Sequence, residues 1–122
     1  MRLFIHSTHG PEAPSQADRA LLIAETALRE GHEVAMFLAG DAVRMWKEPV
    51  WSSKLGLGPD AVPVADRAAR IAQLGGRIVL SRLSCETRGI EPDAQTNGQW
   101  QLGEPLDLVR MTEACDKMIT YG

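Results

Sequence analysis

Apolar residues along this chain follow two different spacings. Three short runs, at residues 2–6, 33–38 and 77–81, are largely apolar without alternation, which is typical of strands buried on both faces of a sheet. Two longer segments place apolar residues at the i, i+3, i+4, i+7 spacing of an amphipathic helix, one ending before Gly31 and the other covering residues 63–74. The pattern therefore predicts strands and helices that alternate along the chain.

The first predicted helix has signals at both ends. Ser15 is expected to cap its start, with Asp18 three residues on, and Gly31 is expected to end it. Glu25 and Arg29 lie four residues apart, which predicts an exposed ion pair on the polar side of the helix. The apolar stripe of this helix consists of Ala17, Ala20, Leu21, Ala24, Ala27 and Leu28.

The other segments are shorter or irregular. Residues 47–60, KEPVWSSKLGLGPD, contain two Pro, two Gly and two Ser, and we expect a surface excursion in which Trp51 is a candidate contact for another subunit. In chain order, the remaining predicted elements are a short helix at 42–46, a polar loop at 91–98, a short strand at 99–102, a helix at 105–114 and a last strand at 117–122.

The alternation of strands and helices predicts an α/β fold with a mostly parallel sheet covered by helices on both sides. The length of 122 residues suits one compact domain, so residues 1–122 are expected to form a single domain. In such sheets, ligands and chemistry gather outside the carboxyl ends of the strands. We therefore expect His6, His9, Asp41 and Cys85 at one edge of the sheet, because each ends or follows one of the first three strands.

The charge of the chain is modest and mixed in sign. Lys and Arg number 13 against 16 Asp and Glu, which gives a net charge of -3. Because both signs are interspersed, we expect no direct nucleic-acid binding. No apolar run approaches the roughly 20 residues needed to span a bilayer, and no signal-peptide pattern opens the sequence. The composition therefore predicts a cytoplasmic protein that does not contact a membrane.

The two cysteines are predicted to be reduced thiols with different roles. Cys85 and Cys115 form no Cys-x-x-Cys pair, which fits neither a disulfide framework nor a standard zinc site. Cys115 shares a helical stripe with Leu108 and Met111, so we expect a small packing residue that faces the sheet.

Cys85 lies in RIVLSRLSCETRGIEP, residues 77–92, just after an apolar strand instead of inside it. The surrounding residues suit the start of a helical turn, so backbone N–H groups near Cys85 and Glu86 are expected to point towards the thiol and stabilise a thiolate. Arg82 and Arg88 are expected to add positive potential, whereas the Glu86 carboxylate opposes it. The alternative is a half-buried, unreactive thiol in an ordinary loop.

Three stretches of the chain resemble one known family. They are GHEVAMFLAGDAVRMW after the first helix, LSCETRGI at the third strand, and the closing LVRMTEACDKMITYG. Together they resemble the DsrE/DsrF-like proteins of sulfur relay systems, and the resemblance covers almost the whole chain. The Cys-x-x-Arg-Gly spacing that begins at Cys85 is its most specific part.

This resemblance implies a three-layer α/β/α fold around a mostly parallel sheet of about five strands. In relay members of the family, a cysteine in the loop after the third strand receives sulfur as a persulfide and passes it to a partner protein, and that role falls on Cys85 here. Such members assemble as trimers or hexamers, so the resemblance implies a homo-oligomer with sulfur donor and acceptor proteins as partners. This sulfurtransferase chemistry needs neither a metal nor an organic cofactor. His9 and Asp41 are candidates for the edge of the site.

A cofactor-binding module of flavodoxin type is one alternative. STHGPE follows the first strand, where a phosphate loop would lie, and Ser7 and Gly10 suit such a loop. Glu12, however, would place a carboxylate near the phosphate, and the Gly-rich spacing of phosphate and dinucleotide loops is missing.

A metal site is a second alternative. His6, His9, Asp41 and Cys85 have side chains that suit Zn²⁺ or Fe²⁺, and all four are expected at one edge. No close-spaced pair of ligands supports such a site, so we expect no bound metal. His9 is instead a candidate hydrogen-bond donor or proton shuttle beside Cys85.

A third alternative is a non-catalytic subunit or binding module whose thiol is incidental. Trp46 and Trp51, in or beside the irregular segment, are candidate interface anchors in that case, or they pack beneath their own loop. The reactivity of Cys85 separates this alternative from the sulfur relay.

Overall fold

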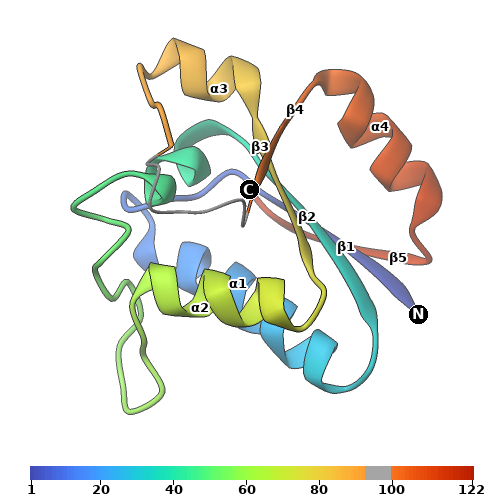
Figure 1. The fold of residues 1–122 in the computed structure, drawn as a ribbon, viewed down its shortest axis with the longest axis horizontal. Helices are drawn as coiled ribbons and strands as arrows, with labels where there is room; N and C mark the ends of the chain where they lie inside the picture. Colours follow the sequence, from blue (N-terminus) through green and yellow to red (C-terminus); the bar gives the residue numbers. More distant parts are fainter. Residues whose placement is uncertain (93–99) are drawn as a thin grey trace.

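A parallel sheet forms the centre of the molecule (Figure 1). The structure is a computed structural model that describes residues 1–92 and 100–122. Over these residues the sheet has the order β4-β3-β2-β1-β5, and each neighbouring pair of strands is parallel, as predicted. The strands are β1 (Arg2–Ser7), β2 (Glu33–Leu38), β3 (Arg77–Ser81), β4 (Gln101–Gly103) and β5 (Lys117–Tyr121).

Helices cover both faces of this sheet, which gives the predicted three-layer α/β/α arrangement (Figure 1). Helices α1 (Pro14–Arg29) and α2 (Val64–Gln73) lie side by side on one face, and α4 (Pro105–Ala114) lies on the other. Two short helices, the 3₁₀ helix η1 (Gly40–Trp46) and α3 (Arg82–Thr87), follow β2 and β3 directly and contact each other.

Alternate residues of the strands enter two separate apolar clusters. Leu3 and Ile5 of β1 belong to the large cluster beneath α1 and α2. Phe4, between them, belongs to a smaller cluster with Phe37 and Met111 on the α4 side. Successive side chains of a strand point to opposite faces, so a sheet covered on both sides needs apolar residues at consecutive positions. This double burial explains why the strands show apolar runs without alternation.

The register of the sheet brings three loops to one edge. Ser7 at the end of β1 pairs with Leu38 at the end of β2, and Leu38 pairs with Leu80 near the end of β3. Parallel strands in this register finish at the same level, so the segments that follow them emerge together. The predicted common edge for Asp41 and Cys85 is therefore present.

The first helix differs from its predicted form. It begins at Pro14 after Ala13, with no side-chain cap, so the predicted Ser15 cap is wrong. A proline suits the first helical position because its fixed backbone angle and missing N–H cost nothing there. Glu25 is also not exposed as predicted: only 5% of its surface is accessible.

The two tryptophans are buried beneath their own loop. Trp46 is 0% and Trp51 is 5% exposed, and their ring centroids lie 5.3 Å apart. The predicted subunit contact through Trp51 and the interface-anchor interpretation of both tryptophans are therefore wrong. Residues 47–60 are irregular, as expected, but aromatic burial ties them to the large cluster.

The remaining boundaries follow the predictions closely. Helix α4 and strands β2 and β3 have the predicted bounds, while η1 begins two residues before the predicted short helix, at Gly40. The short strand predicted at 99–102 corresponds to β4, and its first predicted residue and most of the predicted loop 91–98 lie outside the described residues. Within the described part of the chain, no helix has the length and apolar character needed to cross a membrane.

Candidate functional site at the carboxyl edge of the sheet

Cys85 lies on α3, which begins where β3 ends. The Ser81 side chain caps this helix, because its Oγ accepts a hydrogen bond from the N–H of Ser84 at 3.1 Å. The helix therefore starts at Arg82, and the N–H groups that helical geometry leaves free are those of its first turn. The N–H groups of Cys85 and Glu86 lie beyond that turn and are not the free anion donors that we predicted.

The thiol of Cys85 is covered by its surroundings. Cys85 is 4% exposed and belongs to the large apolar cluster. Burial raises the pKa of the thiol, the charge of Arg88 lowers it, and the charge of Glu86 raises it again, so the pKa lies above the ordinary value of a cysteine. The thiol is therefore protonated at neutral pH. The prediction of a stabilised thiolate is wrong for this conformation, because desolvation outweighs the nearby guanidinium.

A hollow of about 360 Å³ lies against the thiol. Small-molecule sites have volumes of roughly 300–1,000 Å³, so the space suits a small ligand or an added sulfur atom. One basic and two acidic residues are among those that line it. Among the described residues, the lining consists of Lys47, Cys85, Glu86, Gly89, Ile90 and Glu91.

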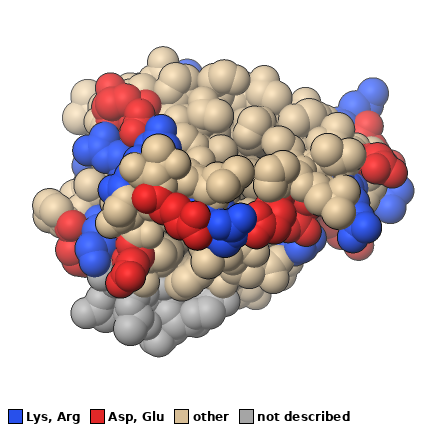
Figure 2. Space-filling model, turned by 90° about the horizontal axis from the view of Figure 1, so that it is seen from above, with Lys and Arg blue, Asp and Glu red and all other residues tan. Residues whose placement is uncertain are grey.

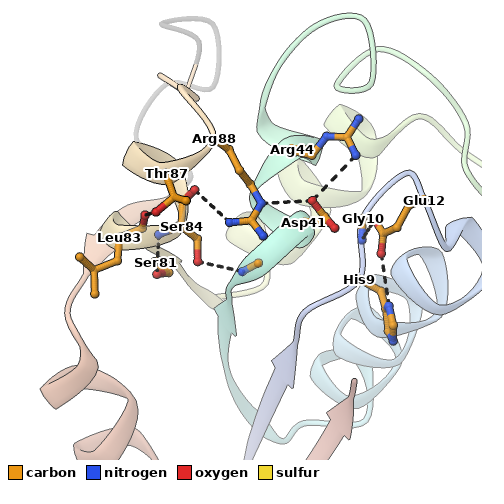
Figure 3. Close-up of polar contacts among 11 residues, drawn as sticks. His9, Gly10, Glu12, Asp41, Arg44, Ser81, Leu83, Ser84, Thr87 and Arg88 are labelled. Carbon is orange, nitrogen blue, oxygen red and sulfur yellow. Dashed lines mark hydrogen bonds and ion pairs between the residues drawn. The ribbon is translucent and has the colours of Figure 1, made fainter.

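Arg88, which directly follows α3, and Asp41 of η1 form an ion pair at this edge (Figure 3). The Nε of Arg88 donates to Oδ1 of Asp41 at 3.1 Å, and its Nη1 donates to the carbonyl oxygen of Ser84 at 3.4 Å. The Nη1 of Arg44 lies 3.9 Å from the same Asp41 oxygen. Asp41 thus holds the guanidinium that lowers the pKa of Cys85.

A second contact joins the same two elements. The N–H of Gly40 donates to Oγ of Ser84 at 2.8 Å. Gly40 has a φ of +55°, in the left-handed region that favours glycine. On the other side of η1, a Cβ at Gly10 would clash with the carbonyl oxygen of Asp41, so the loop after β1 packs directly on this segment. Segments following β1, β2 and β3 therefore form one packed edge.

Arg82 and Glu86 lie on the outer side of α3. The Nη1 of Arg82 donates to Oε1 of Glu86 at 2.8 Å, and its Nη2 donates to Oε2 of Glu104 at 2.9 Å. Arg82 thus links α3 to the residue that caps α4. Of the two guanidinium groups predicted to add positive potential, Arg88 lowers the Cys85 pKa as expected, and the Glu86 carboxylate opposes it, also as expected. Arg82 binds carboxylates on the outer side of the helix.

The two predicted histidines have local partners. The Nδ1 of His9 lies 3.3 Å from Oε2 of Glu12 in its own loop (Figure 3). His6 lies inside β1, with its ring 6.1 Å from that of Phe37 in an edge-on arrangement, and burial lowers its pKa. No group of three His, Cys, Asp or Glu side chains among the described residues could hold a metal ion, so the four candidate ligands of the metal-site alternative do not converge.

In the loop after β1, the carboxylate of Glu12 accepts a hydrogen bond from the loop's own backbone. The N–H of Gly10 donates to Oε1 of Glu12 at 2.8 Å (Figure 3). A phosphate in this loop would compete with that carboxylate for the same donor and would be repelled by its charge. The contact therefore argues against the phosphate-loop alternative.

Comparison with known proteins identifies the family. The model of the DsrE/DsrF-like family matches residues 1–121. The chain belongs to the DsrE/DsrF-like family. No curated protein matches the sequence.

Two solved structures share the DsrE/DsrF-like fold of this chain. The ychN protein from E. coli is 22% identical, with 99% of each chain covered and a TM-score of 0.79. A conserved protein of unknown function from Bacteroides thetaiotaomicron, BT1422, is 15% identical, with 98% of this chain and 93% of that chain covered and a TM-score of 0.71. At these identities the similarity shows the fold.

Cys115 of this DsrE/DsrF-like protein is a packing residue, as predicted. It directly follows α4 and packs, together with Leu108, against the smaller apolar cluster. Its Sγ donates to the carbonyl oxygen of Thr112 at 3.2 Å. Cys115 also lines a second hollow, of about 380 Å³, where the strands begin, and the described lining of that hollow shares no residue with the Cys85 hollow.

Figure 2 views the molecule from the top of Figure 1, the side on which α3 lies. Charges of both signs are interspersed on this face. Figure 2 shows acidic and basic side chains next to one another there, with no broad basic area among the coloured residues. This face therefore lacks the single-sign surface that binds a nucleic-acid backbone.

Two residues of the site escaped the sequence-based predictions. Lys47 lines the Cys85 hollow, although its segment reads as a surface excursion. Ser84 binds Gly40 across 44 positions of the chain, and no local pattern signals such a contact. Only the tertiary structure brings Lys47 and Gly40 to the segment that carries Ser84 and Cys85.

Proposed function

We propose that this protein takes up sulfane sulfur on Cys85 and passes it to a partner protein. In the first transfer, the Cys85 thiolate attacks the outer sulfur of a donor persulfide. A new S–S bond forms at Cys85, the donor's own S–S bond breaks, and the donor leaves as a thiolate that takes up the proton lost from Cys85. In the second transfer, an acceptor thiolate attacks the outer sulfur and Cys85 becomes a thiol again. These exchanges balance without an added oxidant, reductant or cofactor.

The observation that carries this proposal is the place of Cys85 on the wall of a hollow at the carboxyl edge of the sheet. A persulfide adds one atom beyond Sγ, and the hollow offers space for it. Arg88 supports an anion there, because its charge lowers the pKa of the thiol. Family membership agrees with a sulfur-handling role.

Burial of Cys85 limits the reaction in this conformation. A thiol with a raised pKa has little thiolate at neutral pH, and 4% exposure leaves little room for a donor sulfur to approach. The proposed transfer therefore requires a movement that uncovers the thiol, such as a shift of α3 when a partner binds.

Intact-mass measurement after incubation with glutathione persulfide tests the proposal. We expect the wild type and Cys115→Ser to gain one or more sulfur atoms and Cys85→Ser to gain none. Cys115→Ser is the matched control because it removes the other cysteine and leaves the hollow untouched. Equal sulfur uptake by Cys85→Ser and the wild type would remove the assignment.

A second candidate function is a non-catalytic subunit with an incidental thiol. The burial of Cys85 favours it, since a covered thiol with a raised pKa is typical of a structural cysteine. A wild-type protein that takes up no sulfur from small persulfides or from protein donors would support this candidate against the relay.

We also propose that the chain forms a homo-oligomer, a trimer or hexamer, and works as one domain in the cytoplasm. Support comes from four large apolar side chains that are about half exposed on α3, β4 and α4, because exposed apolar residues that gather into one patch mark interfaces. They are Leu83 at 49%, Leu102 at 49%, Leu106 at 54% and Val109 at 54%. The free state of both cysteines fits a reducing compartment.

Light scattering coupled to size-exclusion chromatography tests the assembly. We expect a mass of several chains for the wild type and a smaller mass for Val109→Asp. Leu57→Asp is the control, because Leu57 is 98% exposed and lies on the irregular segment instead of α4. A monomeric wild type would contradict the proposed assembly.

A further inference from the structure

Two hydrogen-bonded contacts next to Cys85 join α3 and its C-terminal cap to η1. Ser84 lies in α3, and Arg88 caps the C-terminal end of that helix. Ser84 accepts the N–H of Gly40 at 2.8 Å, and Arg88 donates to Asp41 at 3.1 Å. Figure 3 shows the contact from Arg88 to Asp41 and the contact from Ser84 to the same short segment. Cys85 lies between Ser84 and Arg88 in sequence, on the helix that these two contacts hold.

Asp41 acts on Arg88 in two ways. Its carboxylate fixes the guanidinium through Nε, while the guanidinium also binds the Ser84 carbonyl oxygen at 3.4 Å. The same carboxylate partly offsets the positive charge that Arg88 presents to the thiol. Asp41 is itself held in place, because Gly10 packs against its carbonyl oxygen. The pair thus joins a fixed anchor on η1 to the helix that carries Cys85.

We propose that Asp41 is a positioning residue that keeps Cys85 covered by holding Arg88, and with it α3, against η1, and that its carboxylate offsets the charge of Arg88 near the thiol. This inference rests on the proposed function, because release of the Asp41–Arg88 pair would expose the thiol for sulfur transfer. Arg88 and Asp41 have side chains 31% and 38% exposed, so their pair is accessible to a docking partner. Pairs of this exposure are weak, and breaking one raises the open population by about two- to fivefold.

Alkylation of Cys85 by iodoacetamide, followed by intact mass in a Cys115→Ser background, measures both proposed effects. The rate at high pH reports how often the thiol is uncovered, and the midpoint of the pH–rate curve reports its acidity. For Asp41→Asn we expect a plateau about two- to fivefold higher and a lower midpoint. The other charged residues that line the hollow beside Cys85, Lys47, Glu86 and Glu91, are unchanged in this variant.

Three further variants separate positioning from general loosening. Arg44→Gln removes the other partner of Asp41 without touching α3, and we expect wild-type labelling. Ser84→Ala removes the hydrogen bond from the Gly40 N–H and is expected to raise the plateau of the alkylation rate. Arg88→Gln is expected to raise the plateau of the alkylation rate as Asp41→Asn does. The double variant Asp41→Asn/Arg88→Gln is expected to raise it no further than either single variant, because the two residues act as one pair.

Labelling of Asp41→Asn and Ser84→Ala at the wild-type rate and midpoint would overturn the inference. Additive effects in the double variant would also overturn it, since Asp41 would then act through another group. Circular dichroism establishes that each variant is folded, and Ser84→Ala keeps the test open if Asp41→Asn does not fold. Alkylation by iodoacetamide does not depend on a persulfide. If the variants change labelling as expected but the protein takes up no sulfur, the proposed function is contradicted and this inference is supported.

Discussion

Glu25 of α1 and Arg67 of α2 form a buried ion pair, with Nη1 of Arg67 2.8 Å from Oε1 of Glu25 and each residue 5% exposed. Arg29 binds the other carboxylate oxygen at 2.7 Å. Burial raises the pKa of Glu25, but the hydrogen bonds and charges of Arg67 and Arg29 more than offset this, so the pKa lies below its ordinary value. The pair fastens the two helices that cover one face of the sheet.

Replacing Glu25 by Gln should strongly destabilise the protein. The change leaves the charge of Arg67 buried without its carboxylate, which costs about 3–5 kcal/mol. Urea unfolding measures the loss. Arg29→Gln is the matched control, because the Arg29 side chain is 58% exposed and its loss should cost less than about 1 kcal/mol. Equal losses in the two variants would show that burial of the pair contributes nothing.

Acid should weaken the fold through Glu25. Its pKa is lower in the folded protein than in the unfolded chain, so its contribution is present above the ordinary value, about 4.3, and is lost as the pH falls through the folded pKa. We therefore expect the melting temperature to fall below about pH 4.3. The fall should be shallower in Glu25→Gln, which lacks the titrating group. Identical slopes would mean that other carboxylates carry the acid sensitivity.

Trp51 should stabilise the irregular segment by packing on Trp46. The rings lie 5.3 Å apart and Trp51 is 5% exposed, so Trp51→Ala is expected to cost about 3–5 kcal/mol. Leu57→Ala provides the control in the same segment, because Leu57 is 98% exposed and its loss should change stability by less than about 0.5 kcal/mol. A Trp51→Ala protein as stable as the wild type would mean that the segment is not anchored there.

Alkylation of Cys85 should have a midpoint above the ordinary cysteine pKa of about 8.5. Burial disfavours the thiolate, and the Glu86 charge acts in the same direction. Glu86→Gln should therefore lower the midpoint. A cysteine-containing model peptide, labelled in parallel, provides the reference. A wild-type midpoint at or below the reference would contradict the burial of the thiol.

Much of the framework is readable in the sequence. The bounds of β2, β3 and α4 match their predictions because consecutive apolar residues and the 3.6-residue period are local signals. The parallel sheet follows from the alternation of such strands with helices, and the common edge of Asp41 and Cys85 follows from the parallel sheet. The packing role of Cys115 is likewise visible from its stripe with Leu108 and Met111.

The properties of the candidate site are less readable. A helical start after β3 is predictable, but the Ser81 cap moves it ahead of Cys85 and removes the predicted free amides. His9 and Arg82 have suitable chemistry, yet each binds a carboxylate instead of the thiol. A side chain chooses among partners by distance in space, and the sequence alone does not supply that distance.

The sequence by itself determined the elements, their order and the family, because these depend on residue type and on spacing along the chain. Tertiary structure alone decided that Glu25 meets Arg67 across 42 positions and that Ser84 meets Gly40 across 44. It also decided that Trp51 and Cys85 are covered. Burial and ion pairing are set by the segments that pack over a residue, and those segments are distant in sequence.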